Sequence, residues 1–205
     1  CRFEFPALSE SLQVKAAYTA STEIQCISPS SANTGMSYVS VSVNDRFDWS
    51  ARSLQFTYHE TLLLKSFEPQ YGPLTGETKV RIYGSNFTPE IYCRFGMSIS
   101  VKATFIDNSK IDCITPSKEF PGKETVSISV NQVDWVDAHD LDFVYYGDFI
   151  VSSMSPTKGS TIGTTLVTVF GHSFPKSGEY LCKFDDSIVV GEYVHESDNV
   201  GVRCK

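Results

Sequence analysis

The stretch SFEPQYGPLTGETKVRIYGSNF, from Ser66 to Phe87, decides the fold because the chain contains it twice. The second copy is SMSPTKGSTIGTTLVTVFGHSF, from Ser153 to Phe174, and it aligns without a gap at an offset of 87 residues. The proline, the turn glycines and the alternating β-branched residues fall at the same places in both copies. Self-similarity at one fixed period indicates that the chain is built from internal structural repeats.

A second block recurs at the same offset. IQCISPS, from Ile24 to Ser30, matches IDCITPS, from Ile111 to Ser117. VSVSVN, from Val39 to Asn44, likewise matches VSISVN, from Val126 to Asn131. The order of the blocks predicts one complete unit flanked by parts of two others.

We therefore expect three segments: the C-terminal part of a first repeat in residues 1–60, a complete second repeat in residues 61–147, and the N-terminal part of a third repeat in residues 148–205. Half a β-sandwich would expose a core face and unpaired strand edges, so we expect the missing halves to exist, either in the parent chain or in a neighbouring segment. The abrupt start at Cys1 favours the same view, namely a piece of a longer protein.

The repeated blocks alternate apolar and polar residues. Val126, Ile128 and Val130 point to one side of an extended chain, with serines between them. A period of two in β-branched and aromatic residues predicts half-buried strands, and turn residues separate these strands at short intervals. About seven short strands in each repeat are typical of an immunoglobulin-like sandwich. We therefore expect an all-β chain of tandem Ig-like β-sandwiches.

The chain contains six cysteines, two in each segment. The simplest connectivity is pairing within the repeat, although six cysteines allow many others. It would join Cys1 to Cys26, Cys93 to Cys113 and Cys182 to Cys204. Each disulfide would contribute roughly 3 kcal/mol of stability and would imply an oxidising compartment. The alternative, a metal site, is disfavoured because the sequence has no CxxC motif and no histidine at ligand spacing.

The middle repeat resembles a known family. Its blocks SFEPQYGPLTGETKVRIYGSNF, CRFG, IDCITPS, VSISVN and LDFVYY, between Ser66 and Tyr146, are similar to the motif of the IPT/TIG domain. The resemblance implies an early-set Ig-like sandwich. Tandem copies form stalks of surface receptors such as plexins and the hepatocyte growth factor receptor, and related copies occur in protist adhesion and ciliary surface proteins.

The resemblance also covers Rel-type transcription factors and some starch-processing bacterial enzymes. This chain departs from the Rel-type group through its paired cysteines and its acidic charge. The third repeat reads CKFDD, from Cys182 to Asp186, where the family pattern has CRFG, so its turn is expected to differ.

Composition excludes several classes of function. The formal net charge is −7, and the lysines and arginines form no basic stripe, so we expect no nucleic-acid partner. No apolar run approaches the roughly 18 residues that a membrane helix needs. Fourteen phenylalanines and ten tyrosines can fill a substantial core.

The sequence offers no catalytic or cofactor-binding constellation. FGHSF, from Phe170 to Phe174, has the glycine and serine that begin a nucleophile elbow. However, the elbow's second glycine is absent, no helix follows, and Asn86 holds the place of Ser173 in the middle repeat. We expect a strand that ends in a turn, no enzyme activity, no cofactor and no metal.

Three weaker signals remain. Asn86 begins the sequon NFT, which makes it a candidate for N-glycosylation in a secreted protein, although Pro89 follows and lowers its use. Aspartates crowd the stretch VDWVDAHDLD, from Val133 to Asp142, but without EF-hand spacing, so a solvated hairpin is favoured over a calcium site. Trp49 and Trp135 lie in matching loops; we expect partial burial, and an exposed ring there would be the first candidate for interaction.

We therefore expect a non-enzymatic structural or adhesion segment of a larger extracellular surface or fibrous protein, namely a semi-rigid rod of disulfide-bonded repeats. The joins lack the Gly/Ser runs of flexible linkers. Its partners would be proteins or further copies of itself. Two alternatives stay open: a receptor ectodomain stalk that binds a protein ligand, and an accessory domain of a carbohydrate-active enzyme.

Overall fold

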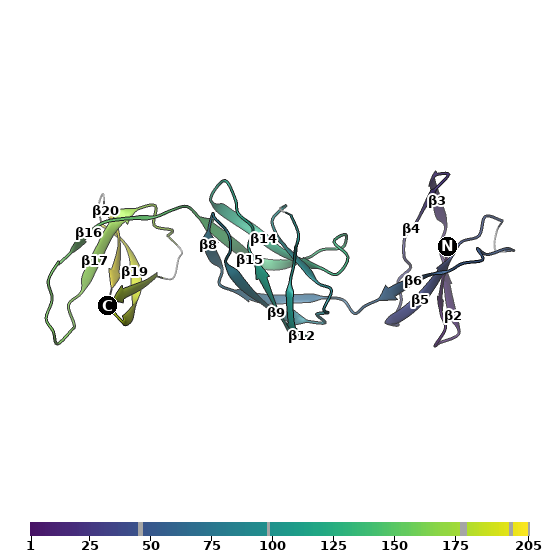
Figure 1. Ribbon diagram of the computed structural model, residues 1–205, viewed down its shortest axis with the longest axis horizontal. Helices are drawn as coiled ribbons and strands as arrows, with labels where there is room; N and C mark the ends of the chain where they lie inside the picture. Colours follow the sequence, from purple (N-terminus) through teal and green to yellow (C-terminus); the bar gives the residue numbers. More distant parts are fainter. Residues whose placement is uncertain (45–46, 98, 177–179, 197–198, 205) are drawn as a thin grey trace. The chain divides into compact units, whose positions relative to one another are not determined.

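The computed structural model describes residues 1–44, 47–97, 99–176, 180–196 and 199–204. The described residues form strands and turns without a helix, so the all-β prediction is confirmed (Figure 1). The chain divides into two compact units, Cys1–Thr61 and Leu62–Lys205. The division lies close to the first predicted boundary; the boundary near residue 147 falls inside the second unit and stays a prediction.

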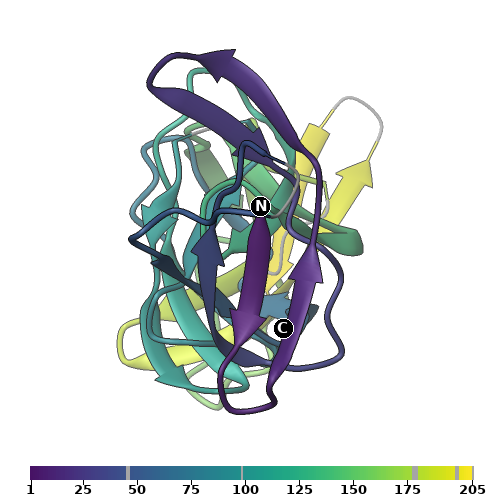
Figure 2. The same ribbon diagram turned by 90° about the vertical axis from the view of Figure 1, so that its right-hand side faces the viewer.

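The N-terminal unit contains a sheet and a separate hairpin. The sheet has the order β2-β1-β5-β6, and its strands are β1 (Arg2–Phe5), β2 (Glu10–Gln13), β5 (Gly35–Ser40) and β6 (Leu54–Tyr58). The hairpin pairs β3 (Ala16–Ala20) with β4 (Glu23–Cys26). Figure 2 faces this unit, with β1 beginning at the N label beside its neighbours. Phe3 and Phe5 are buried on this sheet because they alternate with polar residues along β1.

The middle repeat is a two-layer sandwich. One layer has the order β12-β13-β9-β7, from β12 (Thr104–Asp107), β13 (Lys110–Ile114), β9 (Lys79–Ser85) and β7 (Leu63–Glu68). The other has the order β11-β10-β14-β15-β8, from β11 (Val101–Lys102), β10 (Tyr92–Phe95), β14 (Gly122–Ser129), β15 (Val136–Tyr146) and β8 (Tyr71–Pro73). Neighbouring strands within each layer pair antiparallel, except β15 and β8, which pair parallel. This is the predicted Ig-like architecture.

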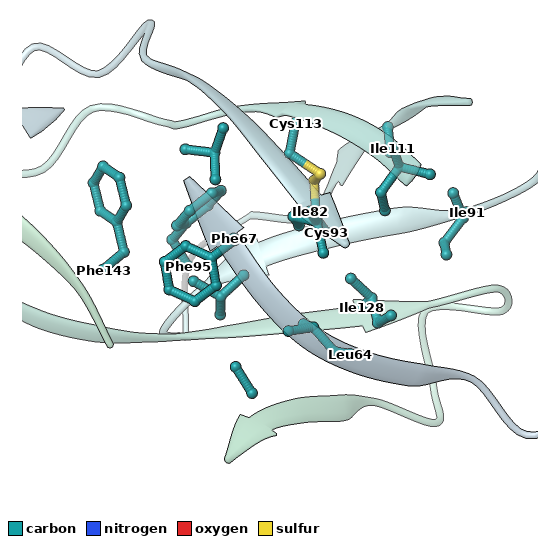
Figure 3. Close-up of a cluster of buried hydrophobic side chains, with 14 of the residues drawn as sticks. Leu64, Phe67, Ile82, Ile91, Cys93, Phe95, Ile111, Cys113, Ile128 and Phe143 are labelled. Atoms are coloured by element: carbon teal, nitrogen blue, oxygen red, sulfur yellow. A yellow bond between two sulfur atoms is a disulfide. The ribbon is translucent and has the colours of Figure 1, made fainter. Parts of the chain in front are cut away.

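The core of the middle repeat lies between the two layers (Figure 3). Inward residues of β9, β10, β13 and β14 are fully buried, as their period-two pattern predicts. Phe95, Phe143 and Tyr145 pack edge to face, with ring centroids 5.2 Å apart between Phe95 and Phe143 and 4.9 Å apart between Phe143 and Tyr145. Cys93 on β10 is bonded to Cys113 on β13, so this disulfide joins the two layers through the core.

The third repeat forms one sheet in the order β16-β17-β20-β19-β18. Its strands are β16 (Ile150–Ser155), β17 (Val167–His172), β18 (Tyr180–Phe184), β19 (Ser187–Glu196) and β20 (Asn199–Cys204). Among the described residues, no strand pairs with the outer edge of β18, whereas the equivalent strand β10 pairs there with β14. Phe184 is therefore 44% exposed, while its counterpart Phe95 is fully buried.

A close approach of two strands explains the glycine that recurs in the repeats. A Cβ at Gly84 would lie 1.9 Å from the carbonyl oxygen of Leu63, and one at Gly171 would lie 2.0 Å from that of Ile150. Any side chain would force β7 away from β9 in the middle repeat, or β16 away from β17 in the third.

Candidate interaction surfaces

The loop between β14 and β15 folds back and positions Trp135. Asn131 Oδ1 accepts hydrogen bonds from the backbone N–H groups of Val133 and Asp134, at 2.9 and 2.8 Å, which forms a tight Asx-type turn. The indole N–H of Trp135 donates to the carbonyl oxygen of Gln132 at 3.2 Å. These bonds fix the loop from within, so the tryptophan is held in one orientation.

Trp135 stacks on Arg94, which lies on β10, the strand next to β14 in the same sheet. The guanidinium carbon of Arg94 lies 4.2 Å from the centroid of the Trp135 ring, and that of Arg2 lies 4.1 Å from the centroid of the Trp49 ring in the first repeat. Both geometries are cation–π contacts. The two tryptophans are half-buried, in agreement with the partial burial that was expected for these matching loops. Their rings are engaged by arginine, so the role of either in binding a partner stays a prediction.

The same end of the middle repeat exposes apolar side chains. Val133 is 77% exposed beside the tryptophan, and Ile99 is 85% exposed in the loop between β10 and β11. The hydroxyl of Ser100 donates to the side-chain oxygen of Gln132 at 2.5 Å, which ties the two loops together. The two loops therefore form one surface, which we call the Val133 surface, made of Ile99, Ser100, Gln132 and Val133.

A buried carboxylate links the two central strands of the opposite layer. Asp112 on β13 is 5% exposed and faces Arg81 on β9, which donates two hydrogen bonds to it, at 2.8 and 3.1 Å. Lys79 Nζ lies 2.7 Å from the same carboxylate. The Arg81 hydrogen bonds are the main cause that lowers the pKa of Asp112 to about 2. The pattern indicates a structural ion pair, since both cations lie on the outer face of the sheet.

The candidate calcium stretch does not gather ligands. Asp134 accepts a hydrogen bond from the Asn131 amide at 2.8 Å, and Asp142 lies 4.0 Å from Lys123 Nζ. Over the described part of the chain, no group of three or more His, Cys, Asp or Glu residues is arranged to hold a metal ion. The described residues also contain no helix long and apolar enough to cross a membrane.

The cysteines pair within each repeat. The structure contains the disulfides Cys1–Cys26, Cys93–Cys113 and Cys182–Cys204. Asn86, the sequon asparagine, lies directly after β9 with φ +66°, and its repeat equivalent Ser173 has φ +63°. Ser173 therefore occupies a turn after β17, which agrees with the strand-ending interpretation of FGHSF.

Aromatic rings occupy the join between the middle and third repeats. The ring of Phe149 lies 6.1 Å from that of Tyr146 and 5.7 Å from that of Phe174. Tyr180 continues the contact, 6.0 Å from Phe174. The join is therefore packed, as the absence of a Gly/Ser run suggested.

Comparison with known proteins places the middle repeat in a family. Residues 62–144 match the sequence profile of the IPT/TIG domain, and these residues coincide with the two-layer sandwich. The middle repeat is an IPT/TIG domain. The disulfide between its layers, the glycine of β9 and the Arg94–Trp135 stack are thus features of an IPT/TIG unit in this chain.

Several curated relatives of the chain are plexins. Plexin-A4 of Homo sapiens is 32% identical over 129 residues, covering 62% of the chain and 7% of the relative. Plexin-A2 of Mus musculus is 29% identical over 150 residues, covering 66% and 8%. Fibrocystin-L of Homo sapiens is 29% identical over 157 residues, covering 74% and 4%. The chain spans less than a tenth of the length of these relatives.

Among solved structures, the full extracellular region of plexin A4 aligns with 86% of the chain and 15% of its own length, at 22% identity and a TM-score of 0.45.

One recurring contact was absent from the sequence-based predictions. The hydroxyl of Tyr145 bonds the carbonyl oxygen of Pro116, and that of Tyr58 bonds Pro29. The offset of 87 residues relates both pairs, so comparing tyrosines and prolines between repeats could have found them. The Asp112 ion pair left no such signal, because Gln25 and Arg203 hold the equivalent places.

Proposed function

We propose that the chain is a non-catalytic spacer in the ectodomain of a receptor-like cell-surface protein. Of the functions that the sequence left open, we therefore favour the receptor ectodomain stalk over the structural or adhesion segment of a fibrous assembly. The similarity to plexins over most of the chain supports this order. The observation that carries the proposal is the buried disulfide that joins the layers of the middle repeat, with one further disulfide in each flanking repeat.

Disulfides suit an extracellular spacer for two reasons. They persist in oxidising compartments, and they stabilise small domains whose cores are limited. Cys93 and Cys113 are both fully buried, so their bond is protected from solvent reductants and holds the two layers against separation. A load applied along the chain would act first on β7 and β15, and the disulfide would keep the segment between Cys93 and Cys113 from being extended.

The packed join supports a spacer that resists bending. Phe149 contacts Tyr146 on one side and Phe174 on the other, so bending at this place would separate aromatic rings. Protein partners would bind on exposed loops, and the Val133 surface is the candidate in the middle repeat because its apolar side chains are presented by a fixed loop.

The compartment can be tested by counting thiols. The 205-residue chain would be secreted from cultured eukaryotic cells behind a signal peptide, alkylated after denaturation without reductant, and weighed intact. We expect no alkylation at any cysteine and full alkylation after reduction. The same chain made in a reducing cytosol is the control and should unfold at lower denaturant. Equal stability of the oxidised and reduced forms would contradict the proposal.

The spacer role needs a second measurement. Dyes placed at the exposed positions Lys123 and Ile188 would report the distance between the middle and third repeats in single molecules. A narrow distribution is expected, and Phe149→Ala should broaden it. A wild-type distribution as broad as that of the variant would argue against a spacer and favour a flexible tether.

A further inference from the structure

The turn that follows β9 carries a complete glycosylation sequon. Asn86, Phe87 and Thr88 come directly after the strand, and Asn86 has a left-handed backbone with φ +66°. Phe87 is buried, while Pro89 and Glu90, which follow the sequon in the sequence, are exposed. The sequon thus lies where the chain leaves the sandwich, which is the surface setting that N-linked glycans occupy.

Backbone geometry alone does not account for asparagine at this turn. Asparagine tolerates left-handed conformations better than most residues, so a purely conformational role has to be considered. However, Ser173 adopts the same conformation in the third repeat, with φ +63°, and its neighbour Phe174 is buried in the same way as Phe87. Pro175 stands there in place of Thr88, so the third repeat keeps the turn and lacks the sequon.

The attachment point is rigid. The backbone N–H of Gly84 donates to the carbonyl of Ser109 at 2.9 Å, and that of Phe87 donates to the carbonyl of Asn108 at 3.0 Å. The Phe87 ring lies against Gly84, since a Cβ on that glycine would come within 2.5 Å of it. The backbone is thus hydrogen-bonded on both sides of Asn86, which is itself half-buried.

We propose that Asn86 carries an N-linked glycan. The donor is a lipid diphosphate-linked oligosaccharide: a bond forms between Asn86 Nδ2 and the anomeric carbon of the first sugar, the bond from that carbon to the diphosphate oxygen breaks, the lipid diphosphate leaves, and the amide nitrogen loses one proton. The inference rests on the proposed passage through the secretory pathway. Occupancy is partial because Pro89 follows the sequon.

The glycan would define which surface of the middle repeat stays open to proteins. Ser85, which precedes Asn86, pairs with Leu63 at the start of β7, and Leu63 is 48% exposed. A glycan here covers that strand end and its apolar side chain. A protein partner of the glycosylated repeat must therefore use other loops, among them the Val133 surface.

Intact mass provides the test. The secreted 205-residue chain would be weighed before and after treatment with an amidase that removes N-glycans, and the treated peptide would be sequenced for the Asn86→Asp conversion that the amidase leaves. We expect a glycosylated fraction in the wild type, its absence in Asn86→Ser and Thr88→Ala, and a larger fraction in Pro89→Ala. Asn86→Ser is the matched control for folding because it copies Ser173.

The outcomes separate the two proposals. A secreted wild type with all six cysteines oxidised and no detectable glycan overturns the assignment of Asn86 and leaves the extracellular proposal intact. Retention of the glycan in Asn86→Ser would also overturn it. A chain that is folded and stable with reduced cysteines would instead contradict the proposed compartment.

Discussion

The hydroxyl of Tyr145 donates a hydrogen bond to the backbone carbonyl of Pro116 at 3.0 Å, across 29 residues of chain. Tyr58 makes the same bond to Pro29 at 3.1 Å, across the same separation. Each bond ties the last strand of a repeat to the segment that follows the second cysteine. Because two repeats form it between equivalent residues, the bond is a feature of the repeat itself.

Removing this hydroxyl should destabilise the middle repeat. Tyr145 is 1% exposed, so Tyr145→Phe leaves the Pro116 carbonyl without its partner in a buried setting. We expect a loss of about 1 kcal/mol in the free energy of unfolding, measured by denaturant titration. Tyr146→Phe, at the half-buried neighbouring position, is the control and should change stability less. An equal effect of both changes would show that the bond contributes nothing specific.

The same tyrosine predicts a loss of stability in strong base. Burial raises the pKa of Tyr145 from 10.0 to about 12. A raised folded-state pKa means that the contribution is complete below pH 10 and is lost as the pH rises from 10 to about 12. Unfolding titrations over this window, with tyrosinate absorbance followed in parallel, should show a steeper decline for the wild type than for Tyr145→Phe. Parallel declines would contradict the shift.

The sequence predicted those features that the repeats share. The pairing of Cys93 with Cys113 followed from cysteines at equivalent places. The match of Gly84 with Gly171 marked a glycine that the fold requires, but the structure places Gly84 inside β9, close to β7, and not in the predicted turn. A repeat acts as an internal alignment, so a residue required by the fold is seen twice.

Features that occur in only one repeat could not be predicted by comparing the repeats. Asp112 faces Arg81 because β13 and β9 are neighbours in the sheet, and strand order is not visible in a local pattern. The stack of Trp135 on Arg94 depends on a loop that folds back over the adjacent strand, and alternation does not predict the path of a loop. Long-range geometry therefore had to come from the structure.

Gly84→Ala should be strongly destabilising. The added methyl group would meet the Leu63 carbonyl oxygen at 1.9 Å, so β7 would have to move away from β9. We expect a loss of about 2 to 4 kcal/mol, measured by thermal or denaturant unfolding. Gly122→Ala is the matched control, because a Cβ there meets nothing within 4 Å. A tolerated Gly84→Ala would show that the strands can separate at low cost.

The Asp112 ion pair should make the middle repeat sensitive to acid. Because Arg81 lowers the pKa of Asp112 from 3.8 to about 2, the carboxylate contributes stability above pH 3.8 that is lost as the pH falls toward 2. Asp112→Asn should cost about 2 kcal/mol at neutral pH and should flatten the acid limb of the stability profile. Asp137→Asn, at an exposed position, is the control. An unchanged acid limb in Asp112→Asn would locate the acid sensitivity elsewhere.

The stack of Trp135 on Arg94 predicts a change in the accessibility of the indole ring. The chain has two tryptophans, so Trp49→Phe makes Trp135 the sole reporter. In that background, Arg94→Ala removes the cation that lies 4.2 Å from the ring centroid, and we expect red-shifted emission and stronger quenching by acrylamide. Stability should fall by about 1 kcal/mol, since the stack is half-exposed. Arg94→Lys should protect the ring in part, because lysine keeps a positive charge that can lie over the indole. If quenching in Arg94→Ala stays at the background level, the Asx turn and the Gln132 bond alone hold the ring, and the arginine has no positioning role.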